Sequence, residues 1–158
     1  MLFWFLSTSI LTVWYIFKDP RFDYRLLLVG SLLPDVIDAP SGQARWAHSV
    51  TISVAVLAAV MLATTGRKPI RKTLLALPIG MLLHLVFDGA FSNATIFWWP
   101  FLGSWGQSPV PSLERGWLNV PMELIGLALM AWMWRRFGLQ DVERRQQFIR
   151  NGTLTEVR

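Results

Sequence analysis

Two histidines and several acidic residues stand inside apolar stretches of this chain, where ionisable groups are costly. His84 and Asp88 lie four residues apart in "LLHLVFDGAF", so on a helix they share one face. Asp35 and Asp38, three residues apart in "LLPDVID", would be near neighbours too if the helix continues past Pro34. Imidazole and carboxylate together suit zinc, manganese or iron, and coordination supplies the partner that buried carboxylates otherwise lack. The pattern predicts a divalent metal site, with zinc as the first choice and manganese as the second.

Composition places the chain among membrane proteins. Of its 158 residues 53% are hydrophobic, including nine Trp and ten Phe, and the apolar residues gather in blocks. There is no cysteine, which excludes disulfides and thiolate ligands. The net charge of +5 comes from Lys and Arg between the blocks and near the C-terminus, which favours topology-setting loops and anionic headgroups over nucleic acid.

Three apolar blocks are long enough to cross a bilayer at about 20 residues per span, and a fourth is slightly short. They run from about Ala47 to Thr65, from Thr73 to Phe91, from Trp117 to Trp134, and over residues 2–17. The stretch before Asp35 is too short to span, so we expect a half-helix or re-entrant segment that ends at Pro34. The prediction is an all-α integral membrane protein with about four transmembrane helices and one short broken helix.

Basic segments set the expected orientation. "GRKPIRK" and "RRFGLQDVERRQQFIR" should be cytoplasmic by the positive-inside rule. The ionisable residues of the blocks then fall near one depth towards the extracytoplasmic face of a bacterial inner membrane: Asp35, Asp38, His48, His84, Asp88 and Glu123. We expect residues 1–134 to form the membrane-embedded domain. Residues 135–158 would be a basic cytoplasmic tail, lying on anionic inner-leaflet lipids as an interfacial helix.

Each of these residues also has a structural interpretation. His84 and Asp88 as a pair could tie helices together, and Asp35 beside Pro34 could cap a turn. His48 followed by a serine could be part of a helix cap. Glu123 could form an ion pair with Arg115 or Arg45. Their joint placement favours a functional site.

The motifs "GSLLPDVIDAP", "ARWAHS" and "LPIGMLLHLVFDGAFSNATIFWWP" resemble those of the bacterial inner-membrane metal-dependent hydrolase family (YdjM-like). The resemblance runs from about Gly30 to Pro100. It rests on a Leu-Pro-Asp motif with a following Asp, a His-Ser pair and a His-x-x-x-Asp followed by Trp-Pro. It implies metal-dependent hydrolysis and the metal-site residues Asp35, Asp38, His48, His84 and Asp88.

The chain departs from the family pattern at three points. Gln43 stands where the family commonly has a first histidine, and Ala47 replaces a threonine. One extra residue separates Asp35 from Asp38. These departures imply a site that holds fewer ions, that uses another side chain in place of the family histidine, or that has lost catalysis. Glu123 is the candidate replacement for that histidine, chosen by its expected depth in the membrane.

The leading hypothesis is a membrane-embedded hydrolase that attacks with a metal-activated water. A carboxylate not bound to metal, either Glu123 or an aspartate such as Asp38, would be the general base. The depth of the site favours an amphiphilic, lipid-linked substrate, first a phosphoester and second an acyl ester or amide. Arg45 and Arg115 could hold a phosphate, although headgroup anchoring fits them equally well.

Two other classes of function stay open. The same Asp and His cluster could serve a non-catalytic metal-binding or proton/ion-transport subunit, although clustering at one depth favours a site over a conduction path. The basic tail could instead dock a soluble partner or nucleic acid, with nucleic acid the less favoured.

Overall fold

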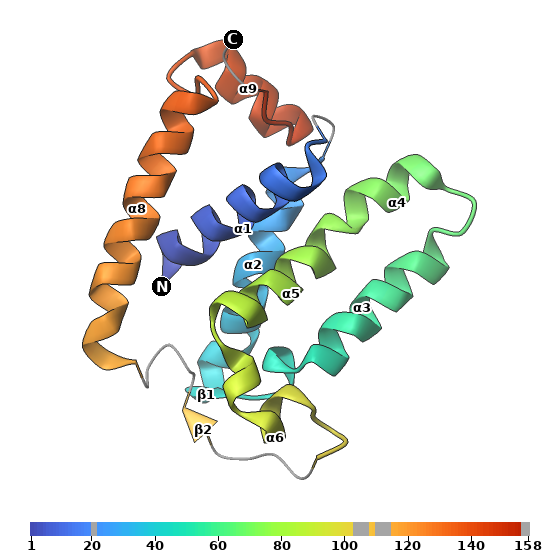
Figure 1. The fold of residues 1–158 in the computed structure, drawn as a ribbon. Helices are drawn as coiled ribbons and strands as arrows, with labels where there is room; N and C mark the ends of the chain where they lie inside the picture. Colours follow the sequence, from blue (N-terminus) through green and yellow to red (C-terminus); the bar gives the residue numbers. More distant parts are fainter. Residues whose placement is uncertain (20–21, 103–107, 110–114, 156–158) are drawn as a thin grey trace.

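The computed structural model describes residues 1–19, 22–102, 108–109 and 115–155, and it is helical almost throughout (Figure 1). The helices are α1 (Leu2–Phe17), α2 (Tyr24–Asp38), α3 (Val50–Ala63), α4 (Lys68–Leu74), α5 (Ala76–Phe87), α6 (Ala94–Phe97), α8 (Asn119–Arg136) and α9 (Val142–Asn151). Short 3-10 turns cover Ala39–Ser41, Trp46–His48, Ala90–Ser92 and Gly116–Leu118. Two short strands, β1 (Gln43–Ala44) and β2 (Ser108–Pro109), pair antiparallel. The prediction of an all-helical fold is confirmed.

Helices α2 and α5 form the most closely packed pair, and two glycines allow their backbones to touch. A Cβ added at Gly30 of α2 would clash with the main-chain carbonyl of Leu77, and one added at Gly80 of α5 would clash with that of Leu27. Small residues at such a contact are typical of helix pairs in membranes, where close van der Waals packing drives association. Because α2 carries the two aspartates and α5 carries His84, this contact sets the spacing of the candidate site.

Helix α1 packs between α2 and α8. Gly126 of α8 lies against the main chain of Phe3 and Trp4, so these helices also approach closely. The buried hydrophobic core comprises Ile10, Val13, Phe22, Tyr24, Leu27, Ala76, Met133, Phe137 and Leu154. It therefore joins α1, α2, the start of α5, the end of α8 and the C-terminal segment.

The basic C-terminal segment is docked onto the start of α2. The predicted helix exists as α9, and Arg25 donates from Nη1 to the main-chain carbonyls of Ile149 at 2.8 Å and Arg150 at 2.7 Å. The main-chain N–H of Tyr24 donates to Gly152 at 2.8 Å. Leu154 beyond the helix is buried in the core. The segment therefore packs with the first helices as part of one fold.

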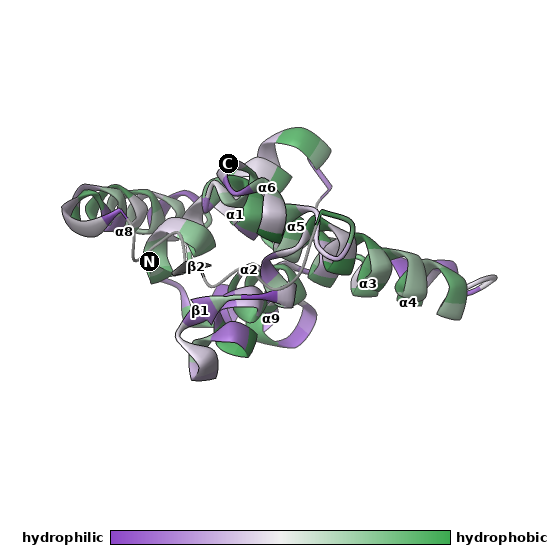
Figure 2. Cartoon of the chain, turned by 90° about the horizontal axis from the view of Figure 1, so that it is seen from below, coloured by the Kyte–Doolittle hydropathy of each residue, from purple (hydrophilic) through white to green (hydrophobic). Residues whose placement is uncertain are grey.

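Two described helical runs are long and apolar enough to cross a membrane. They are Lys68–Phe87, which joins α4 and α5, and Gly116–Arg136, which contains α8. Helices α1 and α3 are apolar but shorter, at 16 and 14 residues. The block expected from Ala47 yields a shorter helix because residues 46–48 form a separate 3-10 turn and α3 begins at Val50. Hydrophobic colour predominates along α3 and α8, which extend to opposite sides of the molecule in Figure 2.

The predicted break at Pro34 is wrong. Helix α2 continues through Pro34 and ends at Asp38, 15 residues after it begins. A proline removes one helical hydrogen bond, but packing against a neighbouring helix can maintain the helix across that gap, and α2 has such support from α5. Asp35 and Asp38 consequently lie on one continuous helix.

The basic segments gather at one end of the molecule. Lys72 of α4 pairs with Asp19 after α1, and Arg25 of α2 donates to the end of α9. These basic segments therefore lie at the same end of the molecule, in the upper part of Figure 1. The end of α2, the two strands and α6 lie in the lower part. Asp35 is 11 residues after Tyr24, which is about 16 Å along the helix axis at 1.5 Å per residue. The candidate site therefore lies away from the basic end.

Candidate metal centre

Three of the predicted site residues come together from three parts of the chain. Asp35 comes from α2, His48 from the turn before α3, and His84 from α5, and one ligand atom of each lies within 4.8 Å of the others. The Nε2 atoms of His48 and His84 lie 3.3 and 3.5 Å from Oδ1 of Asp35. Both imidazoles are fully buried, whereas the Asp35 side chain is 30% exposed. The group is therefore reached from the side of Asp35.

The main chain of α2 fixes the orientation of His84. The Nδ1 atom of His84 lies 2.7 Å from the carbonyl oxygen of Ser31. Because a carbonyl oxygen only accepts hydrogen bonds, Nδ1 must carry the proton, and in neutral imidazole the lone pair is then on Nε2. The ring of Phe5 packs against the imidazole at a centroid distance of 4.2 Å. His84 thus presents the unprotonated Nε2 atom to Asp35.

The side chain of Asp38 fixes the orientation of His48. Its Oδ2 atom lies 2.7 Å from Nδ1 of His48 and also accepts the main-chain N–H of Arg45 at 2.7 Å. The neighbouring Ser49 caps α3 by accepting the N–H of Thr51, and its hydroxyl donates to the carbonyl of Trp99 at 2.8 Å. Asp38 therefore lies behind His48 and orients it, as outer carboxylates orient metal-binding histidines.

The unsatisfied polar atoms of the three residues point to a shared partner. Nε2 of His48, Nε2 of His84 and Oδ1 of Asp35 are buried and have no hydrogen bond within the described part of the chain. Buried polar atoms without partners are costly, and a divalent cation satisfies all three at once. Two imidazole nitrogens and a carboxylate oxygen are a donor set that suits zinc, manganese or iron. The residues present therefore fit a metal ion.

Asp88 lies one turn after His84 and beside Arg115. Its side chain is fully buried, and neither carboxylate oxygen has a hydrogen bond to another described residue. The Nη2 atom of Arg115 lies 3.5 Å from Oδ1 of Asp88 and donates to the main-chain carbonyl of the same residue. Of the two predicted phosphate-binding arginines, Arg115 is therefore adjacent to the site. Arg45 contributes its main-chain N–H to Asp38 and has an exposed side chain.

Glu123 does not join the three residues. Its Oε1 atom accepts the main-chain N–H groups of Leu2 and Phe3, each at 3.0 Å, and Oε2 accepts that of Trp4 at 3.2 Å. The first N–H groups of a helix have no partner within the helix, so a carboxylate there satisfies them and favours the positive end of the helix dipole. This position supports a capping role for Glu123, in place of the expected ligand or general base.

Sequence reasoning missed two contributors to the site. Ser31 acts through its main-chain carbonyl, which leaves no trace in the residue type. Gly80 has a signal that could have been found, because it precedes His84 by four residues and so lies on the same helix face.

Comparison with protein-family models, curated proteins and solved structures gives no match, so the function has to be inferred from the residues of the site.

Proposed function

We propose that this chain is a membrane-embedded metal-dependent hydrolase that acts on an amphiphilic, lipid-linked substrate, with a phosphoester as the favoured bond. The observation that carries the proposal is the convergence of His48 and His84 on Oδ1 of Asp35, with each Nδ1 atom held at 2.7 Å by an acceptor. Three protein ligands are the number that catalytic zinc sites use, whereas structural sites use four. The partial exposure of Asp35 gives a substrate a way in.

The protein groups around the ion have separate tasks. When bound, the ion supplies Lewis acidity and lowers the pKa of a water molecule at the site. Ser31 and Asp38 hold the two imidazoles in the tautomer that leaves Nε2 unprotonated. Asp38 is occupied with His48, and Glu123 with the start of α1. Asp88, close to His84, is a buried carboxylate with no hydrogen bond among the described residues, and it would accept a proton from the attacking water.

Arg115 provides the positive charge beside this carboxylate. Its side chain is 21% exposed, although it contacts the fully buried Asp88. A guanidinium binds phosphate oxygens in a fork geometry that suits a phosphoester headgroup.

The basic end of the molecule would lie in the cytoplasm by the positive-inside rule. Asp35 and Arg115 would then lie towards the extracytoplasmic leaflet of a bacterial inner membrane.

Hydrolysis by the metal-loaded protein tests the proposal. Purified protein in phospholipid nanodiscs, supplied with zinc or manganese, is assayed on lipid phosphoesters and then on acyl esters and amides. We expect turnover by the wild type, and a loss of about 10²–10⁴-fold in Asp88→Asn with the metal retained, as for removal of a general base. Asp141→Asn is the control, because Asn caps a helix as well as Asp and residue 141 caps α9 at the basic end.

Absence of turnover on all three substrate classes by the metal-loaded wild type would contradict the hydrolase. A chain that binds the metal without turnover would instead be a metal-binding or transport subunit that uses the same residues. Loss of metal in Asp88→Asn would make Asp88 a ligand and overturn its assignment as the base.

A further inference from the structure

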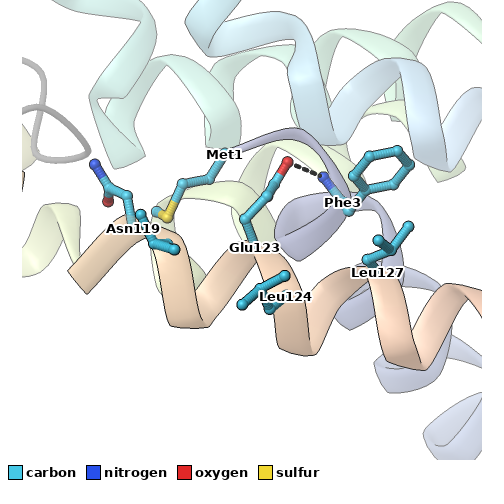
Figure 3. Close-up of a pocket in the computed structure, with 7 residues that line it drawn as sticks. Met1, Phe3, Asn119, Glu123, Leu124 and Leu127 are labelled. Carbon is cyan, nitrogen blue, oxygen red and sulfur yellow. Dashed lines mark hydrogen bonds between the residues drawn. The ribbon is translucent and has the colours of Figure 1, made fainter. Parts of the chain in front are cut away.

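A groove lies between the start of α1 and the first turns of α8. It has a volume of about 480 Å³, within the range of about 300–1,000 Å³ typical of small-molecule sites. Its lining consists of Met1, Phe3, Asn119, Val120, Glu123, Leu124 and Leu127. Figure 3 shows these side chains along α8 and the beginning of α1.

The chemistry of the groove favours an apolar occupant. Five of its seven lining residues are hydrophobic. The acidic group, Glu123, directs its carboxylate to the main-chain N–H of Phe3 (Figure 3) and bonds those of Leu2 and Trp4 as well. The carboxylate is thus satisfied within the protein and needs no hydrogen-bond donor from a ligand. Exposed Val120, Leu124 and Leu127 offer the apolar surface that remains.

Asn119 marks one end of the groove, and Glu123 lies midway along α8 between Asn119 and Leu127. Arg115, four residues before Asn119, contacts Asp88, so the Asn119 end adjoins the metal centre. Leu127 lies eight residues after Asn119, about 12 Å further along the helix at 1.5 Å per residue. A lipid with its charged headgroup at Arg115 and its hydrocarbon chain running along the groove towards Leu127 matches this order of charged and apolar residues.

Helix α1 forms the wall between the groove and the metal centre. Phe3 lines the groove, the indole N–H of Trp4 donates to the carbonyl of Phe87 at 3.3 Å, and Phe5 packs on the imidazole of His84. The groove and the metal-binding histidine are therefore separated by one turn of α1. Outward-facing Ile125 and Leu124 on α8 are exposed apolar residues, so the groove opens where a bilayer would supply lipid.

We propose that the groove binds one acyl chain of the phospholipid substrate, with the headgroup at Arg115 and the bond to be cleaved next to Asp35. This proposal rests on the proposed hydrolase function. It assigns α8 a direct part in substrate selection: the enzyme recognises a long hydrocarbon chain as well as a phosphate.

Photo-labelling tests occupancy of the groove without any need for turnover. The protein is reconstituted in phosphatidylethanolamine–phosphatidylglycerol vesicles that contain a phosphatidylglycerol with a diazirine on one acyl chain. Labelled positions are mapped by peptide mass spectrometry after irradiation. We expect labelling at Phe3 and Leu124 to exceed that at Ile125, which is exposed on the same helix and does not line the groove. Leu127→Trp, which fills the groove, should lower the labelling of Phe3, whereas Ile125→Trp should leave it unchanged.

Equal labelling of Ile125 and Phe3, unaffected by Leu127→Trp, would overturn the groove as a binding site, because it would show bulk lipid contact only. The kinetic counterpart compares a long-chain lipid phosphoester with a short, water-soluble one. Leu127→Trp should raise KM for the long-chain substrate about tenfold, a size typical of lost apolar contacts, and leave that for the short substrate unchanged.

These readouts separate the two proposals. Labelling of the groove with no hydrolysis of any substrate would support the lipid site and contradict the enzyme. Hydrolysis that Leu127→Trp does not alter, for either chain length, would support the enzyme and contradict the acyl-chain site. Metal content measured on the same samples shows whether Leu127→Trp has disturbed the centre.

Discussion

The Nδ1 atom of His84 lies 2.7 Å from the carbonyl oxygen of Ser31, so a candidate metal ligand on α5 is oriented by the main chain of α2. Asp35, which the other nitrogen of His84 faces, also belongs to α2. The separation of these two helices therefore determines both the direction of the imidazole and its distance from the carboxylate. Binding of an ion by this group would therefore be coupled to the packing of α2 on α5.

Substitution of Gly80 by alanine should weaken metal binding. The added methyl group would clash with the Leu27 carbonyl and push α5 away from α2. We expect a loss of stability of about 1–3 kcal/mol from overpacking and a fall in metal affinity of about 10–100-fold from misdirected ligands. Gly126→Ala is the matched control, because it forces apart α1 and α8 instead. Thermal unfolding in detergent and zinc titration give the two quantities; unchanged affinity in Gly80→Ala would contradict the coupling.

Asp38→Ala should impair the site without removing any member of the three-residue group. His48 would lose the acceptor of its Nδ1 proton, which fixes its tautomer and orientation. Loss of such an outer carboxylate typically costs about 10–100-fold in metal affinity. Competition with a zinc chelator measures the change. If Asp38→Ala bound metal as tightly as the wild type, the orienting role would be wrong, whereas complete loss would make Asp38 a ligand.

Glu123→Ala should lower stability and leave the metal centre intact. Three main-chain N–H groups at the start of α1 would lose their acceptor. Loss of a helix cap costs about 0.5–2 kcal/mol. Thermal unfolding and metal content are measured on the same preparation. A stable variant that has lost its metal would show that Glu123 is a ligand after all.

The contact between α9 and the start of α2 should weaken in acid. Burial would raise the pKa of Asp23, but the hydrogen bond and charge of Arg25, with the N–H groups of Leu26 and Arg25, hold that pKa below its usual value of 3.8. The ionised form is thus favoured in the folded state, so its stabilisation is complete above pH 3.8 and is lost as the pH falls through the lower folded value. Protease cleavage within α9 should therefore increase as the pH falls below 3.8.

Asp23→Asn provides the comparison for this acid effect. Asn retains the capping of α2 but cannot ionise, so the variant should show cleavage that depends less on pH below 3.8. Equal pH dependence in both proteins would place the acid-sensitive group elsewhere.

The sequence predicted much of the site, because short-range spacing carries that information. The helical position of His84 follows from its apolar surroundings, and the spacing of Asp35 and Asp38 makes them neighbours once α2 continues past Pro34. Spacing alone cannot distinguish a ligand from the residue that orients it. Asp35 faces both histidines, whereas Asp38, three residues later, faces only the Nδ1 side of His48.

Long-range contacts account for what sequence reasoning missed. Glu123 meets N–H groups 119 to 121 positions away, and its depth in α8 gave no sign of them. Arg25 meets carbonyls 124 and 125 positions away, a contact that the charge pattern of the tail does not indicate. Pro34 indicates a helix end only for an isolated helix, and the packing of α5 against α2 maintains the helix across it.

Metal stoichiometry tests the central claim most directly. The wild type, His84→Ala and Asp35→Ala are purified in detergent, incubated with zinc or manganese, freed of excess ion and examined by elemental analysis, with Asp141→Asn as the control for loss of a carboxylate. The account predicts close to one ion per chain in the wild type and Asp141→Asn, and loss of that ion in both site variants. A wild type that holds no metal after incubation, or site variants that hold as much as the wild type, would contradict it.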